Sequence, residues 1–316
     1  MSLALVTPSA ATRTRAVPRG QLAHRILLGL GVLAAASLVV YMAVYGFSYY
    51  RLSLEERPLS PWHAQLRSSG TIGLKLGIVS LGMFCILFLY PLRKRWKWLG
   101  TIGSTRRWLN FHILFGVATP MVVTFHTTFR WHGLAGVAYW TMIAVALSGF
   151  VGRYVYAKIP RGVSSVELTV QELETQTAAL ARRLHDQSIF LEEDLAPLLD
   201  IPAPRKIRSM NLVCLLWTML RLDVARVFQV GRLRRRVLSG PQCMATLGGL
   251  LASHDRDLEA VISSVRRQSR LRAAMAFLER TGRMFHLWHA IHRPFSISFV
   301  ALIAIHIGVA LSVGFR

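Results

Sequence analysis

The stretch LNFHILFGVATPMVVTFH, residues 109–126, is apolar over most of its length and carries one histidine near each end, His112 and His126. About 20 largely apolar residues are typical of a helix that crosses a bilayer. Similar stretches recur along the chain, and we expect membrane spans over 26–50, 71–92, 108–129, 136–157 and 291–315. The predicted fold class is therefore all-α, an integral membrane helical bundle of about five spans.

The composition of the whole chain agrees with a membrane protein. Of 316 residues, 53% are hydrophobic and only 17% are charged, and the mean hydropathy is +0.40. The net charge of +23 could indicate a nucleic-acid partner, but the long apolar blocks argue for membrane lipid instead. All but two of the 15 acidic residues lie between Glu167 and Glu279, so the expected spans are almost free of carboxylates.

The charge pattern divides the chain into four parts. They are a disordered basic tail over 1–25, spans one to four over 26–161, a helical cytoplasmic segment over 162–284, and the fifth span over 285–316. In the third part, amphipathic helices are expected over 166–185 and 255–283. The apolar run Met210–Leu220 is too short to cross a bilayer, so we expect it to lie in the membrane interface.

Lysine and arginine set the expected orientation, because cytoplasmic loops carry the excess of these residues. The tail, the loop 93–107 and the segment 158–285 are basic, whereas the loops 51–70 and 130–135 carry few cations. We therefore predict a multi-pass protein of a bacterial cytoplasmic (inner) membrane, with its N-terminus in the cytoplasm and its C-terminus outside.

Four histidines fall inside the expected spans, in two pairs with the same spacing. His112 and His126 are fourteen residues apart on span three, as are His292 and His306 on span five. Fourteen residues complete nearly four helical turns and rise about 21 Å, so each pair lies on one face of its helix. Ionisable side chains inside a span are costly and usually functional.

Spans three and five should run in the same direction, since span four reverses the chain between them. Imidazoles would then face each other at two depths, which is the geometry for two haem b groups, each with two axial histidines. His112 and His292 would hold the iron of the inner haem, and His126 and His306 that of the outer one. The alternative is that these histidines only hydrogen-bond neighbouring helices.

The inner pair has a second candidate. The run HLWHAIHRP, residues 286–294, places histidines at three-residue steps, and Pro294 disturbs the helix there. His289 is therefore a reserve ligand in place of His292. His286 and His289 could otherwise line a quinol or proton site at the cytoplasmic boundary, or be ordinary interfacial residues.

Other residues near the spans fit such a site. Cations at the membrane boundaries would pair with haem propionates or instead reach lipid phosphate, and the candidates are Arg107, Arg130, Arg153 and Arg293. Gly73 and Gly77 have the spacing of close helix packing. Gly116 lies one turn after His112, where it would leave room for a macrocycle or pack against another helix.

The cysteines do not form a motif that binds an iron–sulfur cluster or a covalent haem. The three cysteines, Cys85, Cys214 and Cys243, are far apart, and the sequence contains no C-x-x-C or C-x-x-C-H motif. The chain therefore carries neither an iron–sulfur ligand run nor a covalent c-type haem site.

The two histidine pairs and the segment SGFVGRYVYAKIPR, Ser148–Arg161, resemble the ferric-reductase-like transmembrane cytochrome b superfamily, which includes the NADPH oxidases and bacterial relatives. The resemblance covers about residues 71–161 and 285–315. It implies two haems that carry electrons across the membrane. Unlike the oxidases, the chain has no G-x-G-x-x-G motif after a strand, so no flavin or nicotinamide domain is expected.

We therefore expect an electron-transfer subunit of an oxidoreductase, with no catalytic residue assigned. Its donor would be a quinol, or a cytoplasmic protein such as an iron–sulfur or flavin subunit. Its acceptor outside would be a c-type cytochrome or ferric iron. Two alternatives stay open, a non-redox membrane scaffold or receptor and a proton-coupled transporter, although the lack of carboxylates in the spans weakens the second.

Overall fold

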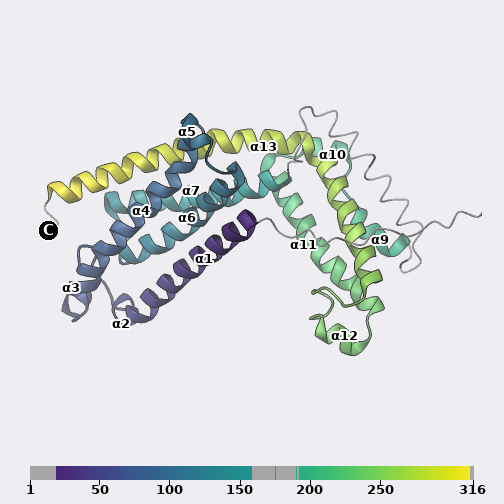
Figure 1. Cartoon of the computed structure of the whole chain (residues 1–316), viewed down its shortest axis with the longest axis horizontal. Helices are drawn as coiled ribbons and strands as arrows, with labels where there is room; N and C mark the ends of the chain where they lie inside the picture. The colour runs from purple at the N-terminus through teal and green to yellow at the C-terminus, as the bar shows by residue number, and fades with distance from the viewer. Residues whose placement is uncertain (1–18, 159–174, 176–189, 191, 314–316) are drawn as a thin grey trace, which may run out of the picture. The chain divides into compact units, whose positions relative to one another are not determined.

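The computed structural model describes residues 19–158, 175, 190 and 192–313, and every regular element in that part of the chain is a helix (Figure 1). Within these described residues, five helical segments are long and apolar enough to cross a membrane. They are Gly20–Tyr45, His63–Arg93, Thr105–His126, Gly133–Lys158 and Arg280–Ser312. The predicted all-α membrane bundle is confirmed.

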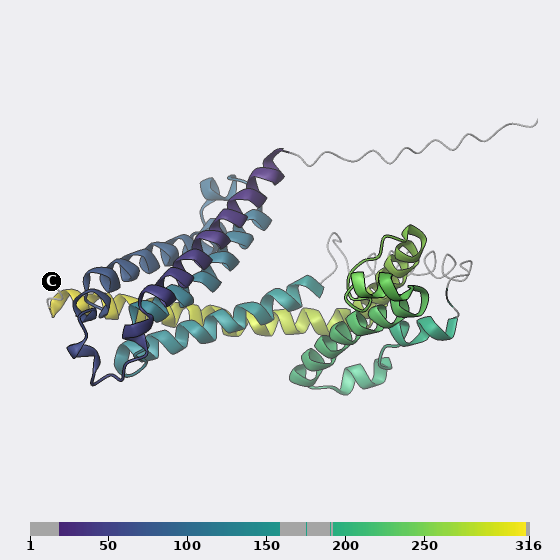
Figure 2. The same cartoon turned by 90° about the horizontal axis from the view of Figure 1, so that it is seen from below.

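The chain forms two compact units, which are described separately: Met1–Gly149 with Pro294–Arg316, and Phe150–Arg293. In the first unit, the helices that lie side by side are α1 (Arg19–Tyr45), α4 (Thr71–Arg93) and α6 (Thr105–His126) (Figures 1 and 2). A short loop with the one-turn helix α5 (Lys97–Gly100) joins α4 to α6. Large apolar side chains point outward from these helices, as expected for a surface in contact with lipid.

The first span ends earlier than predicted, at Tyr45 rather than Tyr50. At Gly46 a Cβ atom would lie 2.3 Å from the ring of Tyr50, so the chain turns tightly there. The connection to α4 then forms α2 (Phe47–Tyr50), η1 (Arg57–Leu59) and α3 (His63–Leu66). This connection and the bundle share one apolar core, made of Met42, Tyr49, Leu66, Leu76, Val122 and Phe125.

The first unit also contains most of α7 (Gly133–Lys158) and the C-terminal part of α13 (Arg256–Ser312). Phe299 of α13 packs against Phe84 of α4, with ring centroids 5.1 Å apart and an edge-to-face angle of 86°. Tyr139 and Met142 of α7 complete this buried cluster. The fifth span is thereby packed against both α4 and α7.

The second unit is built from shorter helices around a core of its own. Its elements are α9 (Glu192–Leu199), α10 (Pro204–Ser209), α11 (Leu212–Val237), α12 (Gly240–Ala245) and the first part of α13. Of the predicted helix 166–185, every residue except Thr175 lies outside the described residues. Leu198, Val230, Leu258 and Ile262 are among the buried core residues that join α9, α11 and α13.

Two helices are longer than the sequence patterns indicated. The apolar run Met210–Leu220 belongs mostly to α11, which continues to Val237 and is not one of the five candidate spans. The predicted helix 255–283 and the predicted fifth span form one helix of 57 residues. Pro294 removes a single backbone hydrogen bond, and the flanking turns continue through it. The predicted boundaries of the helical cytoplasmic segment, at residues 162 and 285, stay predictions.

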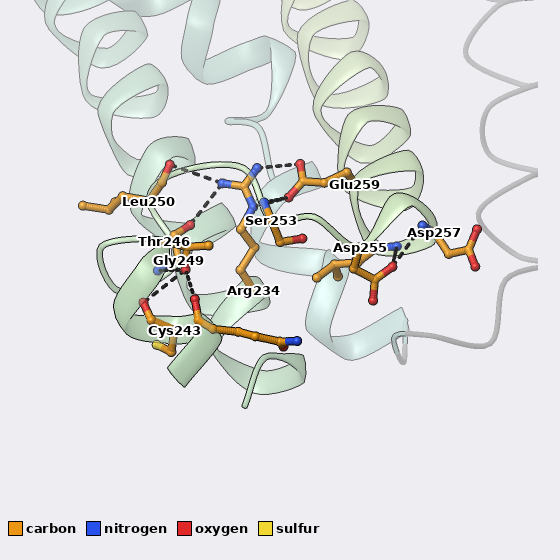
Figure 3. Close-up of polar contacts among 11 residues, drawn as sticks. Arg234, Cys243, Thr246, Gly249, Leu250, Ser253, Asp255, Asp257 and Glu259 are labelled. Atoms are coloured by element: carbon orange, nitrogen blue, oxygen red, sulfur yellow. Dashed lines mark hydrogen bonds and ion pairs between the residues drawn. The ribbon is translucent and has the colours of Figure 1, made fainter. Parts of the chain in front are cut away.

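Arg234 organises the loop between α12 and α13 (Figure 3). Its side chain is only 4% exposed and donates from Nε and Nη2 to the two carboxylate oxygens of Glu259, each at 2.7 Å. Its Nη1 donates to the carbonyl oxygens of Gly249 and Leu250 at 3.0 and 3.3 Å. The hydrogen bonds from Arg234 lower the pKa of Glu259, so the carboxylate stays ionised.

Replacing Arg234 with Ala would leave the Glu259 carboxylate and two loop carbonyls without their donor. We expect a local loss of about 2–3 kcal/mol, the contribution of hydrogen bonds to a charged group. Hydrogen exchange of backbone amides over residues 246–259 in the full-length protein should therefore accelerate. Arg235→Ala is the matched control, because that side chain is exposed and its Nε lies 3.4 Å from the carbonyl oxygen of Gly231. Equal exchange in the two variants would contradict this account.

Candidate functional site

The two histidines of α6 both contact the backbone of α4. Nδ1 of His112 lies 3.0 Å from the carbonyl oxygen of Leu87, and Nδ1 of His126 lies 2.9 Å from that of Gly73. The two carbonyls are fourteen residues apart on α4, as the two histidines are on α6. The antiparallel helices therefore repeat one contact at two levels, about 21 Å apart along the axis.

The carbonyl partners determine which ring nitrogen carries the proton. A carbonyl oxygen only accepts, so Nδ1 of each ring is the donor, and Nε2 of the neutral ring carries a lone pair. No hydrogen bond to Nε2 of His112 or His126 occurs among the described residues. Both rings thus present a metal-ligating nitrogen while the other nitrogen is held by the backbone. Histidines that bind metals are oriented in this way.

Gly77 makes the contact at His126 feasible. A Cβ atom at this position would lie 2.8 Å from Cε1 and 3.0 Å from Nδ1 of the His126 ring. Gly77 therefore admits the imidazole ring of the neighbouring helix, whereas a Cβ atom at Gly73 would lie 2.0 Å from the carbonyl oxygen of Arg67. Gly116 differs, since a Cβ there would make an ordinary contact of 3.6 Å with Leu87, which is helix packing.

Two hydroxyl groups lie one heptad from each histidine level. Thr119 of α6 and Ser80 of α4 are 4% and 5% exposed. In the described part of the chain neither hydroxyl has a hydrogen-bond partner. The helix pair thus has polar groups at its middle as well as at both histidine levels.

His306 belongs to the same unit as His126. Val123 of α6 and Ile303 of α13 pack against one apolar cluster, and each of the two histidines lies three residues after one of them. Seven residues earlier on α13, Phe299 contacts Phe84 of α4, which is near the Leu87 end of that helix. The chain of α13 therefore passes the His112 end of the bundle before the His126 end. It runs in the same direction as α6, which the outer histidine pair requires.

The inner pair is divided between the two units, since His112 lies in the first and His292 in the second. His292 stacks on Trp288, with ring centroids 4.8 Å apart, and His289 lies edge-on to the same indole at 5.3 Å. Gly152 of α7 leaves room for the side chain of Trp288, because a Cβ atom at position 152 would lie 2.1 Å from the indole ring. Pairing of His112 with His292, or with the reserve ligand His289, stays a prediction.

The four arginines proposed for propionates are divided between the two units. The Arg107 guanidinium lies close to Gly20 of α1, where a Cβ would be 3.2 Å from Nη2. Arg130 is exposed in the loop before α7. Arg153 and Arg293 belong to the second unit. Their role toward a haem stays a prediction.

The sequence patterns did not single out Arg57, which is only 4% exposed. Its Nη1 donates to the carbonyl oxygen of Thr128 at 2.5 Å, and its Nη2 to that of Tyr50 at 3.0 Å. Thr128 and Phe129 have φ of 52° and 61°, in the left-handed region that such side chains rarely adopt. Arg57 thus holds the strained turn that begins two residues after His126. No signal in the sequence marks it, because its hydrogen-bond partners are backbone groups.

No protein-family model, curated protein or solved structure matches this chain. Within the residues that the structure describes, no three or more His, Cys, Asp or Glu side chains gather as a metal-ion site. A pair of axial histidines, which is the ligand set expected for a haem b, has fewer members than such a group.

Gly77→Ala should displace the His126 ring from the carbonyl oxygen of Gly73. The added methyl group overlaps the imidazole, and overpacking of this kind costs about 1–3 kcal/mol. Unfolding of the purified protein in detergent should therefore begin at a lower temperature. Gly82→Ala on the same helix is the control, since a Cβ there meets nothing within 4 Å. If both variants unfold like the parent protein, His126 does not depend on this close approach.

Proposed function

We propose that this chain is a transmembrane di-haem b cytochrome, an electron-transfer subunit that carries electrons between a quinol or cytoplasmic donor and an acceptor outside the membrane. One observation carries the proposal: two imidazoles at equal spacing are each held at Nδ1 by a carbonyl of α4, with Nε2 left for a ligand bond. The same ring nitrogen is therefore available at both levels of the bundle.

The residues present fit a haem b at the outer level. His126 offers a neutral Nε2, and the nearby His306 would be the second axial ligand. At the inner level His112 offers the same nitrogen, and its proposed partner is His292, with His289 as the reserve. Neutral imidazole suits iron, and a backbone carbonyl on the second nitrogen makes the ring a stronger ligand.

When bound, haem iron supplies the one-electron chemistry, and the protein controls its surroundings. The carbonyls of Leu87 and Gly73 would fix the planes of the axial rings. Val122 and Phe125 lie beside His126 on α6 and are 1% and 8% exposed, so they would help to keep water from the outer site. Arg107, Arg130, Arg153 and Arg293 remain the proposed partners of haem propionates.

Two levels about 21 Å apart cover most of a bilayer core of about 30 Å, so two haems would carry an electron through it. The resemblance to ferric-reductase-like cytochromes b supports this reading. The lack of a nucleotide-binding motif supports an external donor, a quinol or an iron–sulfur or flavin subunit. The acceptor would be a c-type cytochrome or ferric iron.

We place the protein in a bacterial inner membrane, with its N-terminus in the cytoplasm and its C-terminus outside.

Haem content tests the proposal. The protein purified with haemin supplied should show a reduced b-type absorption band and bind two haems per chain. His126→Ala and His306→Ala should each remove one haem, and His112→Ala and His292→Ala should each remove the other. His132→Ala is the control, because His132 lies exposed in the loop before α7.

If the purified protein is colourless and binds no haemin, this result contradicts the proposal and favours a scaffold or a transporter. Loss of the inner haem in His289→Ala, with retention in His292→Ala, would transfer the ligand role to His289. If the four single variants bind as much haem as the control, these histidines are not the haem ligands.

A further inference from the structure

One face of α11 exposes a continuous apolar stripe. Its members recur at steps of four and three residues, so they share one side of the helix. They are Val213, Trp217, Leu220, Val224 and Val227, with exposed fractions between 42% and 78%. Phe228, 52% exposed, lies beside them. We call these six residues the α11 stripe. From Val213 to Phe228 it extends about 22 Å along the helix.

The opposite face of α11 is packed against the ends of two membrane spans within the same unit. Leu215 and Met219 are buried in a cluster with Val155 of α7 and with Met284 of α13. Val155 lies three residues before the end of the span Gly133–Lys158, and Met284 lies four residues into the span Arg280–Ser312. The first turns of α11 are therefore beside the spans where both reach the membrane boundary.

Polar contacts fix the rotation of α11 about its axis. Asp223 accepts a hydrogen bond from Tyr154 at 2.7 Å and forms ion pairs with Lys158 and Arg226. Burial opposes ionisation of Asp223, but the hydrogen bonds from Lys158 and Tyr154 outweigh it and lower the pKa of this carboxyl. Arg280 donates to the carbonyl oxygen of Met210. These contacts hold the stripe on the outside of the unit.

Basic residues border the stripe. Arg221 lies along one side of it, and Arg232 and Arg235 follow at its C-terminal end, all of them exposed. The charges at Arg221, Asp223 and Arg226 interrupt the apolar sequence, and α11 is not a candidate span. An apolar face with tryptophan and phenylalanine, bordered by arginine, is typical of a helix that lies in the membrane interface.

We propose that α11 lies along the bilayer surface, with its stripe inserted among the acyl chains of one leaflet and its arginines on anionic headgroups. The sequence indicated only that Met210–Leu220 lies in the interface. The structure identifies the inserting face, extends it to Phe228 and connects it to spans four and five. This inference is independent of haem binding.

Accessibility of a spin label tests the insertion. In the full-length chain, with Cys85, Cys214 and Cys243 replaced by Ser, single labels are attached at Trp217→Cys, Leu220→Cys or Val224→Cys. The protein is placed in lipid nanodiscs that contain phosphatidylcholine and phosphatidylglycerol. Labels on the stripe should collide more with oxygen, which concentrates in acyl chains, than with a water-soluble nickel chelate. A label at Ser263→Cys, exposed on α13, should show the reverse preference.

Two outcomes would overturn the insertion of the stripe, and a third would overturn the role of the arginines. Access to the nickel chelate at all three stripe positions would mean that the stripe faces water. Protection from both reagents would mean that protein covers it, whether another part of this chain, a second copy or a different partner. Equal insertion in discs of phosphatidylcholine alone would overturn the role of the arginines. Triple replacement of Arg221, Arg232 and Arg235 by Gln should reduce insertion only in the anionic discs.

Discussion

The hydrogen bonds from the imidazole Nδ1 atoms of α6 to the carbonyl oxygens of α4 are the contacts on which the proposed site depends. A helix carbonyl already accepts from an amide four residues further on, but its second lone pair remains available. Because α4 and α6 are antiparallel, equal spacing on the two helices brings His112 to Leu87 and His126 to Gly73. The same contact then orients both rings.

These hydrogen bonds matter more in apolar surroundings than they would in water. Inside a bilayer no water satisfies a polar group, so an imidazole N–H must find a partner in the protein. Gly77 allows the His126 ring to lie against α4, and Arg57 holds the turn that ends α6 immediately beyond it. The position of His126 is therefore determined from two sides, by the neighbouring helix α4 and by the turn that Arg57 holds.

Much of the fold could be predicted from the sequence, because a sufficiently long run of apolar residues directly indicates a membrane span. The predicted second span, Thr71–Leu92, differs from α4 by one residue. The end of α1 was misplaced, since hydropathy continues through Gly46 while the backbone turns there. The sequence predicted two separate helices where the structure has the single helix α13. The polarity of the residues changes along this helix, but the helical conformation continues.

The candidate site was predictable only in part. Fourteen-residue spacing identified His112, His126, His292 and His306 as pairs, but sequence does not show which backbone groups they contact. The carbonyls of Gly73 and Leu87, and those of Tyr50 and Thr128 that hold Arg57, carry no side-chain signal at all. The proposed inner pair takes one histidine from each unit, so the proposal for it rests on the spacing along α13 and on the resemblance.

Nitrogen NMR of the histidine-labelled protein tests the central claim most directly. In the haem-free protein, His112 and His126 should both be neutral rings with the proton on Nδ1 and a bare Nε2. Addition of haemin should broaden or shift the Nε2 resonances of these two residues and leave that of His132 unchanged. Rings protonated on Nε2, or Nε2 resonances that haemin does not affect, would contradict the account.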